Sequence, residues 1–119
     1  MSSARDPRVL LWDAQEAART ALRFVQGKSL DRFMTDDLLR AGVERQLQIV
    51  GEALNRLSKV APHAAERIPH LQQIIALRNV LVHGYATVDH HNLWNIVTKD
   101  VPPLVETIHS LLGAEEPPQ

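Results

Sequence analysis

Apolar residues recur along this chain at three- and four-residue intervals, with polar residues between them, almost from end to end. That spacing is the period of an amphipathic α-helix, which carries its apolar side chains on one face. No stretch of strand length alternates β-branched with polar residues, and the chain contains only five glycines. We therefore expect an all-α protein without internal repeats or low-complexity segments.

The first predicted helix begins after Asp6, which can cap its N-terminus, with Pro7 at the first helical position. Gly27 is a suitable end, because glycine readily adopts the left-handed conformation that closes a helix. The apolar face consists of Leu10, Ala14, Ala17, Ala21, Phe24 and Val25. Residues 29–34 are predicted to form a connector with one helical turn.

The second predicted helix is the longest of the chain. Thr35 or Asp36 caps it, and it ends near Lys59, before Pro62. Its apolar residues follow a near-heptad spacing: Leu39, Val43, Leu47, Val50, Leu54 and Leu57. A short helix over residues 62–67 is expected to follow.

The third main helix spans roughly residues 70–82 and is followed by a loop at 84–89. A helix over residues 90–99 then leads to Pro102 and Pro103, which fit the first turn of a helix but not its interior. We therefore expect a kink or a restart at Asp100 and a last helix ending at Leu112. Four to five helices with short connections predict an up-and-down bundle, a single domain over residues 1–119 with disordered ends at about 1–5 and 113–119.

Composition narrows the classes of function. The chain is 45% apolar and 23% charged, as folded domains are, and it has no cysteine, which excludes disulfides, thiol catalysis and thiolate zinc sites. No apolar run approaches a membrane span and no signal peptide is recognisable, so a cytoplasmic protein is expected. The net charge is −1, so any contact with RNA requires a local basic patch. His90 and His91 diverge on a helix, and we expect no metal site and no cofactor.

The most informative segment is Leu77-Arg78-Asn79-Val80-Leu81-Val82-His83-Gly84-Tyr85. At about 100° per residue, Arg78 lies in the middle of the apolar stripe that Leu71, Ile75 and Val82 form. A buried, unpaired guanidinium costs several kcal/mol. Arg78 must therefore pair with a carboxylate such as Glu44 or Glu52, face a cleft, or lie at an interface.

Arg78 and His83 diverge by about 140° on one ideal helix, whereas Asn79 and His83 are neighbours on the same flank. One rigid helix cannot focus Arg78 and His83 on the same small group of atoms. The helix end at Gly84, the length of the arginine, or a second copy of the chain can bring them together. Taken singly, each residue has a structural interpretation: an ion pair for Arg78, a helix cap for His83 and a packing residue for Tyr85.

Taken together, the spacing Arg-Asn-X3-His-Gly-Tyr resembles the Arg-X4–6-His motif of the HEPN superfamily, and more narrowly the HepT-like toxins. The resemblance extends to the flanking segments at residues 46–54, 74–79, 88–97 and 100–102, and covers about residues 7–112. It implies an all-α homodimer in which the two motifs face each other. It also implies an RNA endonuclease that requires no metal, in which the ribose 2′-OH attacks the adjacent phosphate and leaves a cyclic phosphate.

In that interpretation Arg78 holds the phosphate and stabilises its developing charge, and His83 takes or gives a proton. Asn79 orients His83 or binds a phosphate oxygen, and Glu52 supports the site. Gly51 lets another helix approach closely.

The resemblance further implies a type VII-like toxin–antitoxin system. In such systems a minimal nucleotidyltransferase antitoxin attaches AMP to the tyrosine that corresponds to Tyr85. Two rival interpretations remain: a non-catalytic module that binds a nucleotide or docks a partner, and a purely structural helical dimer.

Overall fold

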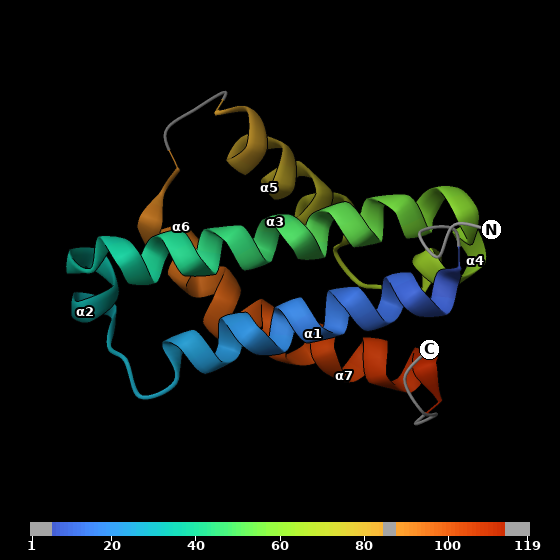
Figure 1. The fold of residues 1–119 in the computed structure, drawn as a ribbon, viewed down its shortest axis with the longest axis horizontal. Coiled ribbons are helices and arrows are strands. Elements are labelled where there is room, and N and C mark those ends of the chain that lie inside the picture. The colour runs from blue at the N-terminus through green and yellow to red at the C-terminus, as the bar shows by residue number, and fades with distance from the viewer. Residues whose placement is uncertain (1–5, 85–87, 114–119) are drawn as a thin grey trace.

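The computed structural model describes residues 6–84 and 88–113. Every regular element in these ranges is helical, and no strand occurs among them. The elements are α1 (Pro7–Val25), α2 (Leu30–Thr35), α3 (Asp37–Val60), α4 (Pro62–Glu66), α5 (Leu71–His83), α6 (His90–Asn95), the π-helix η2 (Ile96–Asp100) and α7 (Val101–Leu112). The long helices run up and down beside one another (Figure 1). The predicted all-α class is confirmed.

The core lies between α1, α3 and the C-terminal helices. On α1 the small residues Ala14, Ala18 and Ala21 have no exposed surface, so α3 can approach closely. On α3 the predicted near-heptad stripe is buried at Val43, Leu47, Val50, Leu54 and Leu57. Each fully buried large apolar side chain contributes about 1.5–3 kcal/mol relative to an exposed one.

The predicted N-caps of α1 and α3 are confirmed. Asp6 accepts a hydrogen bond from the Arg8 backbone N–H at 2.9 Å. Asp36, rather than Thr35, accepts one from the Leu39 N–H at 2.9 Å. This backbone hydrogen bond, together with the guanidinium of Arg32, lowers the pKa of the Asp36 carboxyl below its ordinary value.

The expected restart at Asp100 is confirmed. Helix α7 begins at Val101, with Asp100 as its N-cap residue and the two prolines in its first turn, where their missing backbone N–H groups are tolerated. The sequence did not predict the π-helix η2 directly before it, in which the Val101 N–H bonds to the Ile96 carbonyl oxygen, a five-residue interval.

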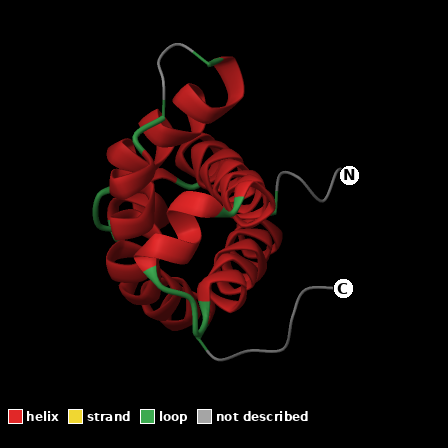
Figure 2. Ribbon diagram, turned by 90° about the vertical axis from the view of Figure 1, so that its left-hand side faces the viewer, coloured by secondary structure: helices red, strands yellow, loops and turns green. Residues whose placement is uncertain are grey.

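Helix α5 is incompletely covered by the rest of the described chain. None of its 13 residues is buried, although Leu71, Ile74, Leu77 and Leu81 pack against the core. It packs mainly against α3, and the end-on view shows one helix projecting from the edge of the bundle beside the grey trace of the omitted residues (Figure 2). Val82 is 44% exposed. The helix that carries Arg78 and His83 therefore has no residue that the rest of the described chain buries completely.

Three remaining expectations concern the ends and the loop. Residues 1–5 and 114–119 of the predicted disordered ends, and residues 85–87 of the predicted loop, lie outside the described residues. Gly113 is described, and it closes α7 in the left-handed conformation. In the described part of the chain, no helix has both the length and the apolar character that crossing a membrane requires.

Candidate active site

Helices α3 and α5 are in close contact at Gly51 and Arg78. A Cβ added to Gly51 would overlap the Arg78 Cβ, lie 2.9 Å from the Arg78 Cγ and lie 3.3 Å from the Ile74 carbonyl oxygen. Only glycine at position 51 therefore permits this separation of the two helices, as the sequence predicted for Gly51. The contact places the stem of Arg78 directly on α3.

The guanidinium of Arg78 is held by an amide. Its Nη1 donates to Asn79 Oδ1 at 3.0 Å, while its Nε is buried without a hydrogen-bond partner. The carboxylates considered from the sequence do not pair with it. Glu52 instead forms an ion pair with Arg56 at 3.1 Å, and among the described residues no ion pair joins Glu44 to Arg78. The half-buried Arg78 thus carries a positive charge that no carboxylate of the described chain neutralises.

His83 is the last residue of α5, and its side chain is exposed. The helix ends there because Gly84 adopts a left-handed conformation, with φ of 62°, and donates its N–H to the Val80 carbonyl oxygen. Gln48 of α3 fastens the same end, since its Nε2 donates to the Leu81 carbonyl oxygen at 3.3 Å. This hydrogen bond was not predicted from the sequence, because a contact between residues 33 positions apart leaves no local pattern.

Polar residues follow one face of α3 beside this site. Arg45, Gln48, Glu52 and Arg56 recur at three- and four-residue intervals. Arg45 donates to Gln48 Oε1 at 3.2 Å, and Arg56 donates to Glu52 at 3.1 Å. This polar face carries two guanidiniums and one carboxylate, and Glu52 offsets the charge of Arg56.

The structure brings some of the predicted site residues together and leaves others apart. Arg78 and Asn79 are hydrogen-bonded to each other, so the Asn79 oxygen is directed at Arg78 rather than at His83. Glu52 lies on the neighbouring face of α3 but is engaged by Arg56. The role predicted for Tyr85 lies outside the described residues. No group of three histidine, aspartate or glutamate side chains in the described ranges is arranged to hold a metal ion.

Known proteins resemble this chain over most of its length. A family model described as Ribonuclease HepT-like matches residues 14–111. "Putative RNase MJ1380" of Methanocaldococcus jannaschii is 30% identical over 106 residues, which are 89% of this chain and 96% of the relative. "Putative RNase TTE0752" of Caldanaerobacter subterraneus is 27% identical over 112 residues, 94% of this chain and 99% of the relative. "Probable ribonuclease HepT" of Thermococcus cleftensis is 29% identical over 100 residues, which are 84% of this chain and 90% of the relative. No solved structure matches this chain.

Proposed function

This chain belongs to the ribonuclease HepT-like family, and we propose that it is the ribonuclease toxin of a type VII-like toxin–antitoxin pair. The proposal rests on the contacts of the Arg78 guanidinium. Its guanidinium is held in place by Asn79, has a buried Nε without a partner, and is paired with no carboxylate. A fixed, unneutralised cation beside a polar helix face is suited to bind an RNA phosphate.

The proposed reaction needs only groups that the chain and the RNA supply. A ribose 2′-OH attacks the adjacent phosphorus, the bond to the 5′-oxygen breaks, and a 2′,3′-cyclic phosphate and a 5′-hydroxyl result. One His83 imidazole accepts the proton of the 2′-OH, and an imidazolium donates a proton to the leaving 5′-oxygen. Arg78 stabilises the negative charge that develops on the phosphoryl oxygens in the transition state. No metal or cofactor takes part in this scheme.

We further propose that the active form is a homodimer assembled through α5. Most of the residues of α5 are apolar, yet none is buried in the single chain. A second copy that covers the C-terminal half of this helix, around the exposed Val82, would remove apolar surface from water. It would also bring a second His83 to the phosphate, so that one histidine acts as the base and the other as the acid.

Regulation is proposed to act through Tyr85. The cognate nucleotidyltransferase antitoxin would transfer AMP from ATP to the Tyr85 hydroxyl and release pyrophosphate. Tyr85 follows His83 by two residues in the sequence. The added phosphate would occupy Arg78 and repel the RNA backbone.

Cleavage of RNA by the purified protein tests the proposal. We expect the wild type to produce cyclic-phosphate ends, and His83→Ala and Arg78→Ala to reduce the rate at least about a hundredfold, as the loss of a general acid–base or a charge-stabilising group does. His109→Ala, at the exposed C-terminal end of α7, is the matched histidine control and should cleave at the wild-type rate. Equal cleavage by all four proteins would identify a contaminating nuclease.

The rival interpretation, a non-catalytic binding module, predicts a different result. The wild type would then bind AMP or RNA with dependence on Arg78 and release no product. For the regulatory step, mass spectrometry after incubation with antitoxin and ATP should detect AMP on Tyr85 and none on Tyr85→Phe. Inhibition without this adduct would contradict the proposed regulation.

A further inference from the structure

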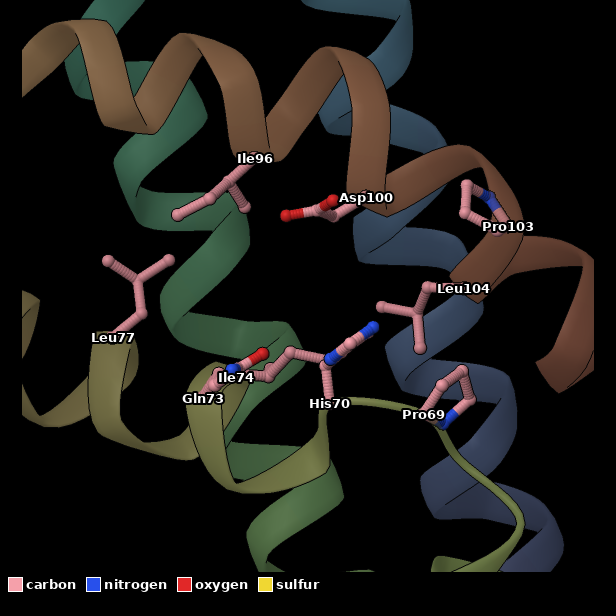
Figure 3. Close-up of a pocket in the computed structure, with 9 residues that line it drawn as sticks. All are labelled: Pro69, His70, Gln73, Ile74, Leu77, Ile96, Asp100, Pro103 and Leu104. Atoms are coloured by element: carbon pink, nitrogen blue, oxygen red, sulfur yellow. The ribbon is translucent and has the colours of Figure 1, made fainter.

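A cavity of about 190 Å³ lies between the start of α5 and the η2–α7 segment. Its apolar walls come from Ile74 and Leu77 on one side and Ile96 on the other, with the buried Leu104 below. Three polar side chains stand at its rim: His70, Gln73 and Asp100. Figure 3 shows His70 and Asp100 reaching toward the cavity from opposite walls.

Each of these two side chains is placed by an irregular piece of backbone. His70 precedes α5 with φ of 60°, and it is the one non-glycine residue of the described chain with a positive φ. Its side chain does not cap the helix, the usual role of a polar residue at this position. Asp100 ends the π-helical turn whose first residue, Ile96, also lines the cavity. Strained backbone and π-helical turns are both concentrated at sites that hold ligands.

The size of the cavity restricts what can enter. An engineered cavity of roughly 150 Å³ in another protein holds one benzene molecule, whereas pockets for whole drug-sized ligands begin at about 300 Å³. A volume of about 190 Å³ therefore fits one small planar ring system, either a single ring or two fused rings. The ring is either a small free molecule or one group of a larger molecule.

The charges restrict the ligand further. No lysine or arginine lines the cavity, so it offers nothing to an anionic group such as a phosphate. In the described chain the Asp100 carboxylate has no hydrogen-bond or ion-pair partner, and it can only accept N–H or O–H donors. Gln73 and His70 can each donate or accept. A planar, uncharged ring with an amino group meets all of these conditions.

From this arrangement we propose that the cavity is a nucleobase site, which takes one unpaired base bearing an exocyclic amino group. Asp100 accepts a hydrogen bond from that amino group, as carboxylates do from the cytosine amino group in protein–DNA complexes. The aliphatic walls cover the faces of the ring. Uracil is disfavoured, because it has no amino group and would direct a carbonyl oxygen toward the carboxylate.

The location links this site to the catalytic residues. Leu77 lines the cavity, and Arg78 follows it on the same helix, on the face that meets α3. An RNA strand whose phosphate is bound by Arg78 can place a nearby splayed-out base in the cavity, a common mode of single-strand recognition. This part of the inference rests on the proposed ribonuclease function. The proposal that the cavity binds a base does not rest on that function.

Binding is tested first without cleavage, by NMR titration of His83→Ala protein with adenosine, cytidine, guanosine and uridine. We expect the first three to shift the methyl signals of Ile74, Leu77 and Ile96 saturably, and uridine to bind at least about fivefold more weakly. Asp100→Asn should weaken binding about tenfold, because its neutral amide oxygen accepts a weaker hydrogen bond than a carboxylate does. Asp13→Asn, an exposed carboxylate on α1, is the matched control and should bind as the parent does.

His70→Gly separates ligand binding from a structural role. Glycine adopts a φ of 60° without strain, so this variant should keep its melting temperature within a few degrees while it loses base binding. A lower melting temperature with unchanged binding would overturn the role of His70. Shifts with butylamine but with no nucleoside would assign the cavity to a basic side chain of a partner protein and overturn the proposal.

Cleavage distinguishes free nucleosides from RNA as the source of the base. With the catalytic histidine restored, wild-type protein should cleave a library of short RNAs with a preference against uridine at one fixed position. Asp100→Asn should lose that preference, measured as the ratio of cleavage of RNAs with cytidine and with uridine at that position. Nucleoside binding without any preference in cleavage would restrict the site to free bases, and absence of cleavage would refute the proposed function while leaving the binding result intact.

Discussion

Gly51 of α3 and Arg78 of α5 touch so closely that no side chain fits between them. A Cβ at position 51 would meet both the stem of Arg78 and the backbone of α5 at Ile74, and the backbone cannot rotate away as a side chain can. The position of the candidate catalytic arginine is thus set by a residue that has no functional group of its own.

Gly51→Ala should therefore impair the site through the separation of the two helices. We expect a loss of about 1–3 kcal/mol of unfolding free energy from overpacking, against a gain of about 1 kcal/mol in helix propensity. RNA cleavage should fall more than stability does, because Arg78 is displaced. Urea denaturation and cleavage assays measure the two effects.

Gly42→Ala is the matched control on the same helix. A Cβ there would lie 3.1 Å from the ring of Phe24, a side chain that is 38% exposed and free to move. This variant should be neutral or slightly more stable and fully active. If the two variants behaved alike, the steric role of Gly51 would be wrong.

Asn79→Ala should weaken the anchoring of Arg78. The variant removes the oxygen that accepts from Arg78 Nη1, and a hydrogen bond to a charged group contributes about 1.5–3 kcal/mol. We expect kcat/KM for RNA cleavage to fall at least about tenfold with little change in fold, as judged by circular dichroism. Asn95→Ala, an exposed residue that ends α6, provides the comparison. A wild-type rate for Asn79→Ala would exclude this anchoring role.

The exposed face of α5 predicts the outcome of placing a charge on it. Val82→Asp should shift sedimentation from a dimer to a monomer, because the carboxylate would have to be buried in the interface. Val60→Asp is closely matched, since Val60 is 43% exposed and Val82 is 44% exposed. Val60 lies at the end of α3, so that variant should remain dimeric. A monomeric wild type, or a dimeric Val82→Asp protein, would refute assembly through α5.

Asp36 predicts a pH dependence of stability. Its pKa is lowered in the folded protein, first by the hydrogen bond from the Leu39 N–H and then by Arg32. The contribution of its charge is therefore complete above the ordinary pKa of 3.8 and is lost as the pH falls through the lowered value. Asp36→Asn keeps the cap without the charge. Wild type should melt at a higher temperature than the variant at pH 7, and the difference should shrink below pH 4. A difference that stayed constant down to pH 2.5 would contradict the assignment.

Several features of the fold could be read from local sequence. The N-cap at Asp6 and the end of α5 at Gly84 depend only on neighbouring residues, and both were predicted. The stripe from Val43 to Leu57 on α3 was also predicted, because its spacing alone determines which face is apolar. The motif residues were found in the same way, by their order along the chain.

Other features depend on residues that are distant in sequence. Local sequence did not indicate that α5 rests at the edge of the bundle with none of its residues buried. Pro102 and Pro103 indicated the restart at Asp100, but not the π-helical turn that precedes it. Neither outcome could be derived locally, because each depends on how much space the neighbouring helices leave.

The sequence by itself determined the helical class, the order of the helices and the Arg78–His83 motif, because helix periodicity, caps and motif spacing are all properties of residues close together in the chain. Only the tertiary structure decided the partner of Arg78, which is Asn79 rather than Glu52. It also decided that Gly51 sets the distance between α3 and α5, and that His70 and Asp100 share a cavity. The physical reason is that packing brings together atoms that the chain holds far apart, and their distances carry no signature in its order.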